Sequence, residues 1–453
     1  MAMRKLGKRL SVLAVLLGAV LVVSAAAESK ARIVRLSEVR GSVQMDRGDG
    51  YEKTFLNMPV IESSKLKTGE DGRAEVEFED GSALRIVPNS EVEFTRLALG
   101  DDGQKLSTMQ LAAGTAYVNF RGKKGDEFTL NFGRESVALT EPAHFRVDMG
   151  NDEATLAVFK GRVNVNGQSG PFEVADKRSV TFDIHSDRYD IAKNYAEDAY
   201  DDWDQQQSEY HDRYAATHSD VSSPYAYGMS DLNYYGNYMV VPGYGTVWQP
   251  YFLDASWSPF QDGGWAWYPG YGYMWVSAYP WGWMPYRYGN WAFVPGYGWV
   301  WQPGYWNAWY PLPRVVNPPH RTAVPVPPVR TRTTVMVGKG LVVNPTAEPP
   351  QRLTITPGSA GLGVPRGTVR NLDRFAREVS KSARPVEVRT EPRISPPARS
   401  TVTDTDSATT TGRPTVGSSG GSSRGGSTPR MTPPSVAPRM PSPTPPVRSS
   451  KPH

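Results

Sequence analysis

The sequence contains no cysteine among its 453 residues, and this absence excludes several classes of protein. A disulfide framework, a thiol nucleophile, an iron–sulfur cluster and a Cys-ligated zinc site all require cysteine. A lipid anchor on an N-terminal cysteine is excluded for the same reason. The lack of cysteine is compatible with an oxidising compartment but does not establish one.

Histidine is scarce, and none of the six lies in a recognisable catalytic context such as Gly-x-Ser-x-Gly or His-Glu-x-x-His. They are His144, His185, His211, His218, His320 and His453. Carboxylates are plentiful, but no feature selects a pair of them for glycosidase-like chemistry. The sequence therefore predicts a protein that is not an enzyme, with no catalytic residue, no cofactor and no metal.

Long apolar runs are also lacking, apart from the 14 residues of Leu10–Val23. A membrane-spanning helix needs about 20 apolar residues, so this run is too short to span. Four cations precede it, and the small residues Ser24-Ala25-Ala26-Ala27 follow it, as in a secretory signal. We expect a signal peptide over residues 1–27, cleaved after Ala27, and an uncleaved anchor is the alternative. The protein is then exported, to the periplasm or to the cell surface or beyond, with no transmembrane helix after cleavage.

Residues 33–182 show the period-2 alternation of β-strands, interrupted every 8–12 residues by Gly, Asp or Asn. In Ala74–Glu79 the alternation is strict, and it places Val76 and Phe78 toward a core while Glu75, Glu77 and Glu79 face water. Such spacing favours a sandwich, barrel or β-solenoid over βαβ units. We expect one all-β domain here.

The turn phrases of this segment resemble the FecR domain, an all-β extracytoplasmic module. The resemblance rests on Leu66-Lys-Thr68-Gly69, Asp80-Gly81-Ser82, Pro88-Asn89-Ser90, Leu111-Ala-Ala-Gly114 and Gly161-Arg-Val163. FecR-type regulators sense the occupancy of an outer-membrane transporter and signal to a sigma factor. They carry a cytoplasmic region and a spanning helix before this domain, whereas only about nine residues precede the apolar run here. The resemblance therefore implies a fold, a compartment and envelope partners, without anti-sigma activity.

Residues 186–218 form a predicted connector helix with an acidic outer face. Apolar and aromatic residues recur there at intervals of 3 or 4, on one helical stripe: Tyr189, Ala192, Tyr195, Ala199, Trp203, Gln206, Tyr210 and Tyr214. The acidic run Asp198–Asp204 lacks the central glycine and the bidentate glutamate of a calcium loop. We interpret it as a solvated helix face whose aromatic stripe docks on a neighbouring domain.

Residues 233–311 hold 12 of the 13 tryptophans and contain a repeat of 26–27 residues. Pro242-Gly243-Tyr244-Gly245 recurs as Pro269–Gly272 and as Pro295–Gly298, each between aromatic segments. A period of this length indicates one supersecondary unit in several copies. The unit is predicted to be an aromatic β-hairpin, because Pro sets φ at the turn and Gly accepts positive φ. A short meander or a propeller-like array would fit. The block also resembles an uncharacterised aromatic repeat that follows FecR-type domains in exported bacterial proteins.

Aromatic side chains of the repeat are either its core or a contact surface, and the sequence leaves both open. Exposed rings could stack on sugars or contact proteins. The candidate ligand or partner contacts are Trp248, Trp257, Trp265, Trp275, Trp283, Trp291, Trp301, Trp309, Tyr244, Tyr271 and Tyr297. The Gly-Tyr-Gly phrases lack the third glycine and the following helix of a dinucleotide site.

Residues 312–453 are rich in Pro, Arg, Ser and Gly, with 21 Lys and Arg against 7 Asp and Glu. This composition predicts a disordered tail, with one short helix within Gly367–Ser382. Its charge would attract an anionic surface polymer, or it is a solvated linker. Nucleic acid is disfavoured by the signal peptide.

The whole sequence thus predicts a non-enzymatic, exported envelope protein. Its FecR-like module would act as a binding or scaffold unit that mediates protein–protein contacts. The first alternative is a protein that binds cell-wall glycan or peptidoglycan through the aromatic repeat. The second is an extracytoplasmic signal sensor without an anti-sigma region of its own.

Overall fold

A computed structural model describes residues 32–100, 102–168, 170–215, 222–306, 336–337, 340–341 and 352–389. The predicted signal peptide, Trp309, His218, His320 and His453 lie outside these residues. The described chain is mostly β-sheet, as the sequence predicts. Within the described ranges, no helix is both long enough and apolar enough to cross a membrane.

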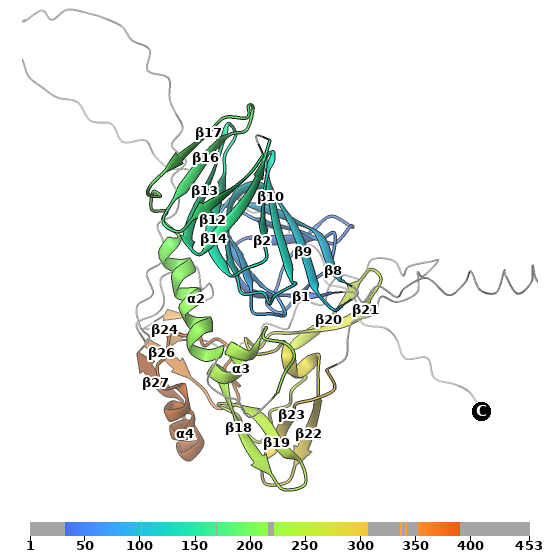
Figure 1. Ribbon diagram of the computed structural model, residues 1–453. Coiled ribbons are helices and arrows are strands. Elements are labelled where there is room, and N and C mark those ends of the chain that lie inside the picture. The colour runs from blue at the N-terminus through green and yellow to red at the C-terminus, as the bar shows by residue number, and fades with distance from the viewer. Residues whose placement is uncertain are drawn as a thin grey trace, which may run out of the picture. The chain divides into compact units, whose positions relative to one another are not determined.

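The FecR-like segment forms two nine-stranded ladders that share the long strand β9 (Lys105–Phe120) (Figure 1). The first runs β3 (Tyr51–Lys53), β2 (Val43–Asp46), β5 (Lys65–Thr68), β8 (Glu91–Leu99), β9, β10 (Glu127–Phe132), β11 (Glu135–Leu139), β14 (Arg162–Gly167), β15 (Gly170–Ala175). The second runs β4 (Pro59–Val60), β1 (Val34–Arg40), β6 (Arg73–Glu77), β7 (Ala83–Ile86), β9, β12 (Ala143–Met149), β13 (Glu153–Lys160), β16 (Ser179–Asp183), β17 (Tyr189–Ala192).

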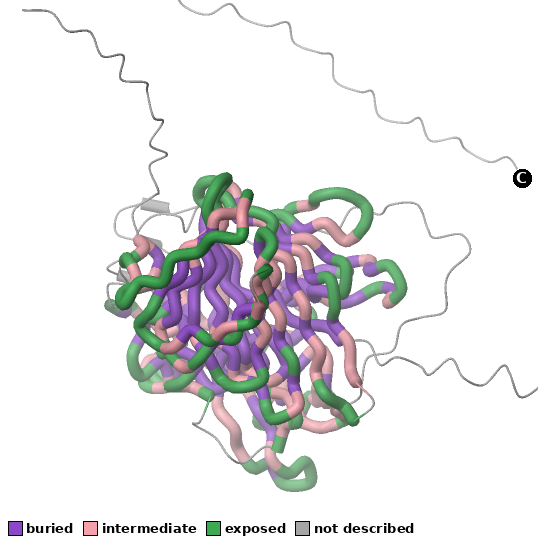
Figure 2. Tube along the Cα trace, turned by 45° about the horizontal axis from the view of Figure 1, so that its top comes forward, coloured by how far each residue is buried: buried purple, intermediate pink, exposed green. Residues whose placement is uncertain are grey.

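Strand β9 passes from one ladder to the other at Gly114. Residues before it pair with β10 in parallel, and residues from Gly114 on pair with β12. Gly114 has a φ of +76°, and a Cβ there would lie 2.4 Å from Asn89 O. Only glycine fits this position, which lets one strand serve both sheets. Apolar side chains of both ladders form one buried core. In Figure 2 the buried positions, drawn in purple, follow one another along the strands.

The connector is shorter as a helix than the sequence predicts. Helix α2 covers Asp201–Ala215, whereas Tyr189–Ala192 is strand β17. The turn before β17 is held by Asp183, whose carboxylate accepts hydrogen bonds from Ser186 Oγ and Arg188 Nη2. This turn folds β17 back onto β16, and Tyr189 stacks on Phe172 with ring centroids 4.7 Å apart. The helical spacing of Tyr189 and Ala192 is therefore incidental.

Helix α3 (Met229–Tyr235) leads into the repeat segment, which forms three hairpins. They are β18 (Gly236–Val241) with β19 (Gly245–Pro250), β20 (Gly263–Tyr268) with β21 (Gly272–Ser277), and β22 (Asn290–Val294) with β23 (Gly298–Gln302). The 3₁₀ turn η1 (Met284–Tyr286) precedes the third. Each hairpin loop holds glycines at positive φ, as predicted from the Pro-Gly-Tyr-Gly phrase.

The hairpins do not form a regular array. The first and third join through Trp248 and Trp301 into a four-stranded sheet, with reciprocal contacts. Gln249 Nε2 donates to Tyr297 O at 2.7 Å, and Gln302 Nε2 donates to Tyr244 O at 2.8 Å. The middle hairpin, β20–β21, pairs with neither of them.

The described part of the predicted disordered tail is folded in the structure. It contains β24 (Met336–Val337), β25 (Gly340–Leu341), β26 (Arg352–Ile355), α4 (Leu372–Ser382) and β27 (Val386–Arg389). The predicted short helix within 367–382 corresponds to α4. The segment 352–389 folds because Leu353, Ile355 and Val369 are buried in the common core. The average composition of residues 312–453 gives no sign of these few buried apolar residues.

Candidate functional site

Hairpin β20–β21 has one face toward the two ladders of the FecR-like domain, which we call the sandwich, and one face toward solvent. Ala266, Tyr268, Met274 and Val276 are buried on the inner face. Arg47, from the β2–β3 turn, lies over the Tyr268 ring at 4.5 Å and donates to Trp267 O at 2.6 Å. These contacts fix the hairpin against the FecR-like domain.

The outer face carries a cross-strand aromatic ladder, which we name the hairpin face: Phe260, Trp265, Trp267, Tyr273 and Trp275. Trp265 pairs with Trp275, and Trp267 with Tyr273, in edge-to-face geometry with centroids 5.5 and 5.1 Å apart. Phe260 extends the ladder, 5.6 Å from Trp275.

Three rings of the hairpin face are half exposed. Phe260 is 54%, Trp265 51% and Tyr273 51% exposed. Clustered exposed aromatics of this kind mark interaction surfaces, whereas single exposed apolar residues are ordinary. Their cross-strand pairing holds the rings in place before any partner arrives, which lowers the entropy cost of binding.

The other two hairpins use the same repeat positions for the core. Trp248 and Trp301, which correspond to Trp275, are fully buried, and their indole nitrogens donate to Leu232 O and Tyr288 O. The same position of the repeated phrase is thus a fully buried residue in two hairpins and a partly exposed residue in the third.

The candidate contact residues divide into three groups. Buried in the core are Trp248, Trp257, Trp283 and Trp301. Partly buried are Tyr271, Trp275 and Trp291, and exposed are Trp265, Tyr244 and Tyr297. The hairpin face brings together only Trp265 and Trp275 from that set. Phe260, Trp267 and Tyr273 complete it. The alternation of Trp267 with Trp265, and of Tyr273 with Trp275, was the signal that could have found two of them.

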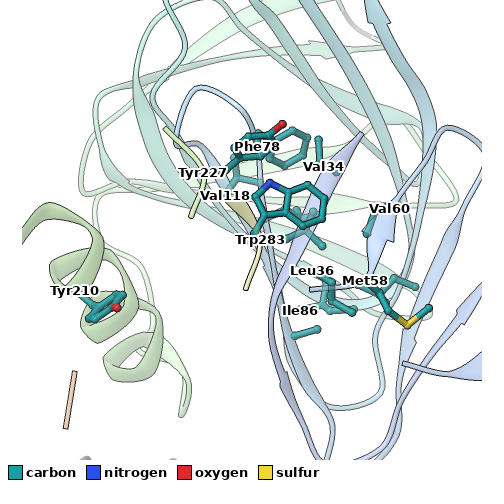
Figure 3. Close-up of a cluster of buried hydrophobic side chains, with 14 of the residues drawn as sticks. Val34, Leu36, Met58, Val60, Phe78, Ile86, Val118, Tyr210, Tyr227 and Trp283 are labelled. Carbon is teal, nitrogen blue, oxygen red and sulfur yellow. The ribbon is translucent and has the colours of Figure 1, made fainter. Parts of the chain in front are cut away.

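Trp283 shows most clearly why a repeat tryptophan is a core residue. Figure 3 shows its ring beside Tyr227 among Val34, Leu36 and Phe78 of the sandwich. Tyr227 and Trp283 pack edge to face at 5.4 Å. The repeat segment therefore completes the hydrophobic core of the FecR-like domain.

The predicted solvent exposure of Glu75, Glu77 and Glu79 is wrong, because all three are buried. Glu79 pairs with Arg32, with 2.6 Å between Nη2 and Oε2. Glu75 and Glu77 belong to a buried ion cluster, which consists of Arg35, Glu75, Glu77, Arg85, Asp204, His211, Asp231 and Arg366. Strict alternation placed the glutamates on the outer face of the sheet correctly. It could not show that helices α2 and α3 and segment 352–389 cover that face.

Glu75 lies at the centre of the buried ion cluster. Its carboxylate oxygens lie 2.7 Å from Arg85 Nε, 2.7 Å from Arg366 Nη1 and 3.0 Å from His211 Nε2. Burial alone would raise the pKa of Glu75, but the charges of His211, Arg85 and Arg366 outweigh it and hold that pKa well below its ordinary value. Glu75 is therefore an anion at neutral pH.

Asp231 of α3 links the cluster to the repeat segment. Arg35 Nη2 and Arg366 Nε lie 2.6 and 3.0 Å from its carboxylate oxygens. These arginines lower its pKa against the opposing effect of burial. For Glu77 the balance differs, since desolvation raises its pKa despite His211 and Arg35. The cluster joins β1, β6, β7, α2, α3 and segment 352–389 through residues far apart in sequence, so no local pattern could identify it.

Comparison with known proteins agrees with the two resemblances found in the sequence. Residues 64–164 match the FecR protein family, and residues 229–322 match a family of unknown function, DUF6600. No curated protein matches the chain.

Among solved structures, two crystal structures of a "putative anti-sigma factor" from Parabacteroides distasonis are similar to part of the chain. They cover 33% of this chain and 71% and 72% of their own, at 14% and 16% identity, each with a TM-score of 0.27.

Proposed function

We propose that this protein is a non-enzymatic binding protein of the cell envelope that contacts a protein partner through the hairpin face. The observation that carries the proposal is the exposed aromatic ladder on a hairpin whose inner face is anchored to the FecR-like domain. Trp and Tyr are enriched at the centres of protein interfaces, where rings enter the partner's pockets. Export and an envelope location follow from the predicted signal peptide and are part of the same proposal.

Site-specific photo-crosslinking in the native envelope tests the contact. A photoreactive residue is placed at Trp265 or Tyr273, with Phe293 as the matched control. Phe293 is 58% exposed and pairs edge to face with Trp299 on the third hairpin, so it has similar chemistry at another place. We expect a discrete crosslinked protein from the first two positions only. Equal products at all three positions would rule out the hairpin face.

Glycan binding is the second candidate, favoured by the half-exposed rings of Trp265 and Tyr273, which can stack on sugar faces. Sedimentation with purified peptidoglycan at low salt tests it. If glycan is the ligand, the Trp265→Ser/Tyr273→Ser double variant loses retention and Phe293→Ser keeps it. Failure of the unaltered protein to sediment contradicts this candidate.

A sensing role is a third candidate, supported by the FecR match over residues 64–164. In that case the sandwich receives a signal from an envelope receptor and passes it on through another protein. Copurification with an outer-membrane receptor from detergent-solubilised envelopes is the expected result. A preparation in which no receptor accompanies the protein argues against sensing.

A further inference from the structure

Helix α4 carries a stripe of cations on the side opposite its buried residues. Leu372, Ala376 and Val379 are buried. Arg374, Arg377 and Lys381 are exposed, and their spacing of 3 and 4 places them together on the far side of the helix. Packing buries the apolar side of α4, so the cationic side is the one that faces solvent and can contact another molecule.

Three more cations enlarge this stripe into a surface. Arg370 precedes α4, Arg384 follows it, and Arg389 ends β27, and all three are exposed. We name these residues the α4 basic surface: Arg370, Arg374, Arg377, Lys381, Arg384 and Arg389. Of the acids near it, Asp373 pairs with Arg377 at 2.8 Å, and both side chains are largely exposed. Such a pair is weak and readily exchanged for another anion.

The chain from residue 32 to residue 311 has the opposite charge. Residues 32–311 contain 24 Lys and Arg against 38 Asp and Glu, a net charge of −14, whereas residues 352–389 contain 8 against 3, a net charge of +5. An anionic surface therefore attracts the α4 side of the molecule and repels most of the remainder. This asymmetry selects one orientation of the bound protein.

The α4 basic surface is also rigidly held. Arg366, a few residues before α4, is buried between Glu75 and Asp231, and Tyr235 Oη donates to Val364 O at 2.8 Å. Val369 N donates to Tyr234 Oη at 3.0 Å. Because Val364, Arg366 and Val369 before the helix are buried, α4 presents its cations without the entropy cost of ordering a free peptide.

We propose that the α4 basic surface docks the protein on a bilayer that contains anionic phospholipid. Three of the cations lie on the exposed side of α4, and the other three lie before it, after it and at the end of β27. Each Lys or Arg near such a bilayer contributes about 1 kcal/mol, so this number of cations suffices for stable attachment at moderate salt. Attachment would hold the hairpin face at a set orientation to the membrane.

Vesicle sedimentation tests the docking, with protein lacking residues 1–27 so that the apolar leader cannot insert. The vesicles contain phosphatidylglycerol and phosphatidylcholine in equal parts, or phosphatidylcholine alone. We expect binding to the first only, weakened by salt. The triple variant Arg374→Gln/Arg377→Gln/Lys381→Gln should bind about 100-fold more weakly.

A matched control removes three cations elsewhere. Arg424→Gln/Arg430→Gln/Arg439→Gln has the same net charge as the triple variant and should bind more strongly than it does. A second variant, Arg384→Gln/Arg389→Gln, leaves α4 intact and should bind about 30-fold more weakly than the unaltered protein. Equal losses in the two triple variants would overturn the proposal. So would binding to soluble polyphosphate without binding to anionic vesicles, which would indicate a polymer ligand instead.

Discussion

At the scale of single residues, glycines decide where the aromatic rings lie. Gly236, Gly263 and Gly289 open the three hairpins, and a Cβ at any of them would collide with the tryptophan of the opposite strand. At Gly236 the added atom would lie 2.4 Å from the Trp248 ring, and at Gly263 it would lie 2.5 Å from the Trp275 ring. Glycine at these positions therefore lets the flat tryptophan ring pack directly against the backbone.

Gly236→Ala should therefore destabilise the protein by about 1–3 kcal/mol, because Trp248 is enclosed and cannot move aside. Gly263→Ala should cost less, since the partly exposed Trp275 can shift toward solvent. Urea unfolding followed by tryptophan fluorescence measures both. A larger loss for Gly263→Ala would contradict this reading of the two sites.

Arg366 is the residue whose removal should matter most in the C-terminal segment. Arg366→Met leaves Glu75 and Asp231 buried with one cation fewer, and breaking a buried ion pair from one side costs about 3–5 kcal/mol. We expect segment 352–389 to become accessible to hydrogen exchange. The exposed Arg374→Met serves as the control and should change stability by less than about 0.5 kcal/mol. Unchanged protection in Arg366→Met would show that the ion pairs do not hold the segment.

At the scale of elements, three copies of one hairpin have different surroundings. Trp248 and Trp301 face each other at the junction of the first and third hairpins, with ring centroids 6.5 Å apart. Valines on the opposite side of those hairpins form a separate small cluster, Val241, Val247, Val294 and Val300. The middle hairpin packs on the sandwich instead, so Trp265 is exposed and Trp267 and Trp275 are partly exposed.

Alanine at equivalent repeat positions should therefore have unequal effects. Trp248→Ala and Trp301→Ala each remove a fully buried indole and should cost about 3–5 kcal/mol. Trp275→Ala removes a partly buried ring and should cost about 1–2 kcal/mol. Chemical denaturation of the three variants gives the comparison. Three equal values would mean that the hairpins are equivalent after all.

At the scale of the whole described chain, the FecR-like and repeat segments are one folding unit. Arg35 Nη2 donates to Pro280 O at 2.7 Å, and Asn57 Nδ2 donates to Tyr279 O at 2.7 Å. Trp283 shares the hydrophobic core of the sandwich, and the buried ion cluster ties both to α2 and segment 352–389. A truncation between the segments would expose both the apolar core and the buried charges.

Stability should therefore depend on pH in a way set by the buried ion cluster. The pKa values of Glu75, Asp204 and Asp231 are lowered in the folded protein by their cationic neighbours, against the opposing effect of burial. Their stabilisation is fully present above the unfolded pKa values of about 4 and is lost as pH falls through the lower folded values. Glu77, whose pKa is raised by burial, contributes in the opposite sense as pH rises above about 4.

Because three lowered groups oppose one raised group, the melting temperature should stay level near neutral pH and fall below about pH 4. Arg366→Met should flatten this dependence, since Arg366 lowers the pKa of both Glu75 and Asp231. Circular dichroism melts from about pH 7 to about pH 3 provide the measurement. If the melting temperature of Arg366→Met falls below about pH 4 as steeply as that of the unaltered protein, Arg366 does not set this pH dependence.

The sequence by itself determined the β character of residues 33–182, the repeat and the hairpin loops, because these depend on local spacing and on the backbone freedom of Gly and Pro. It also placed Glu75 and Glu77 on the outer sheet face and identified α4. Only the tertiary structure decided what covers each face. Glu75 is buried because Arg366 arrives from 291 residues away. Trp275 is partly exposed and Trp248 is not, because the hairpin of Trp275 packs on the sandwich instead of on another hairpin. Burial depends on which distant surfaces meet, and a local pattern carries no information on that.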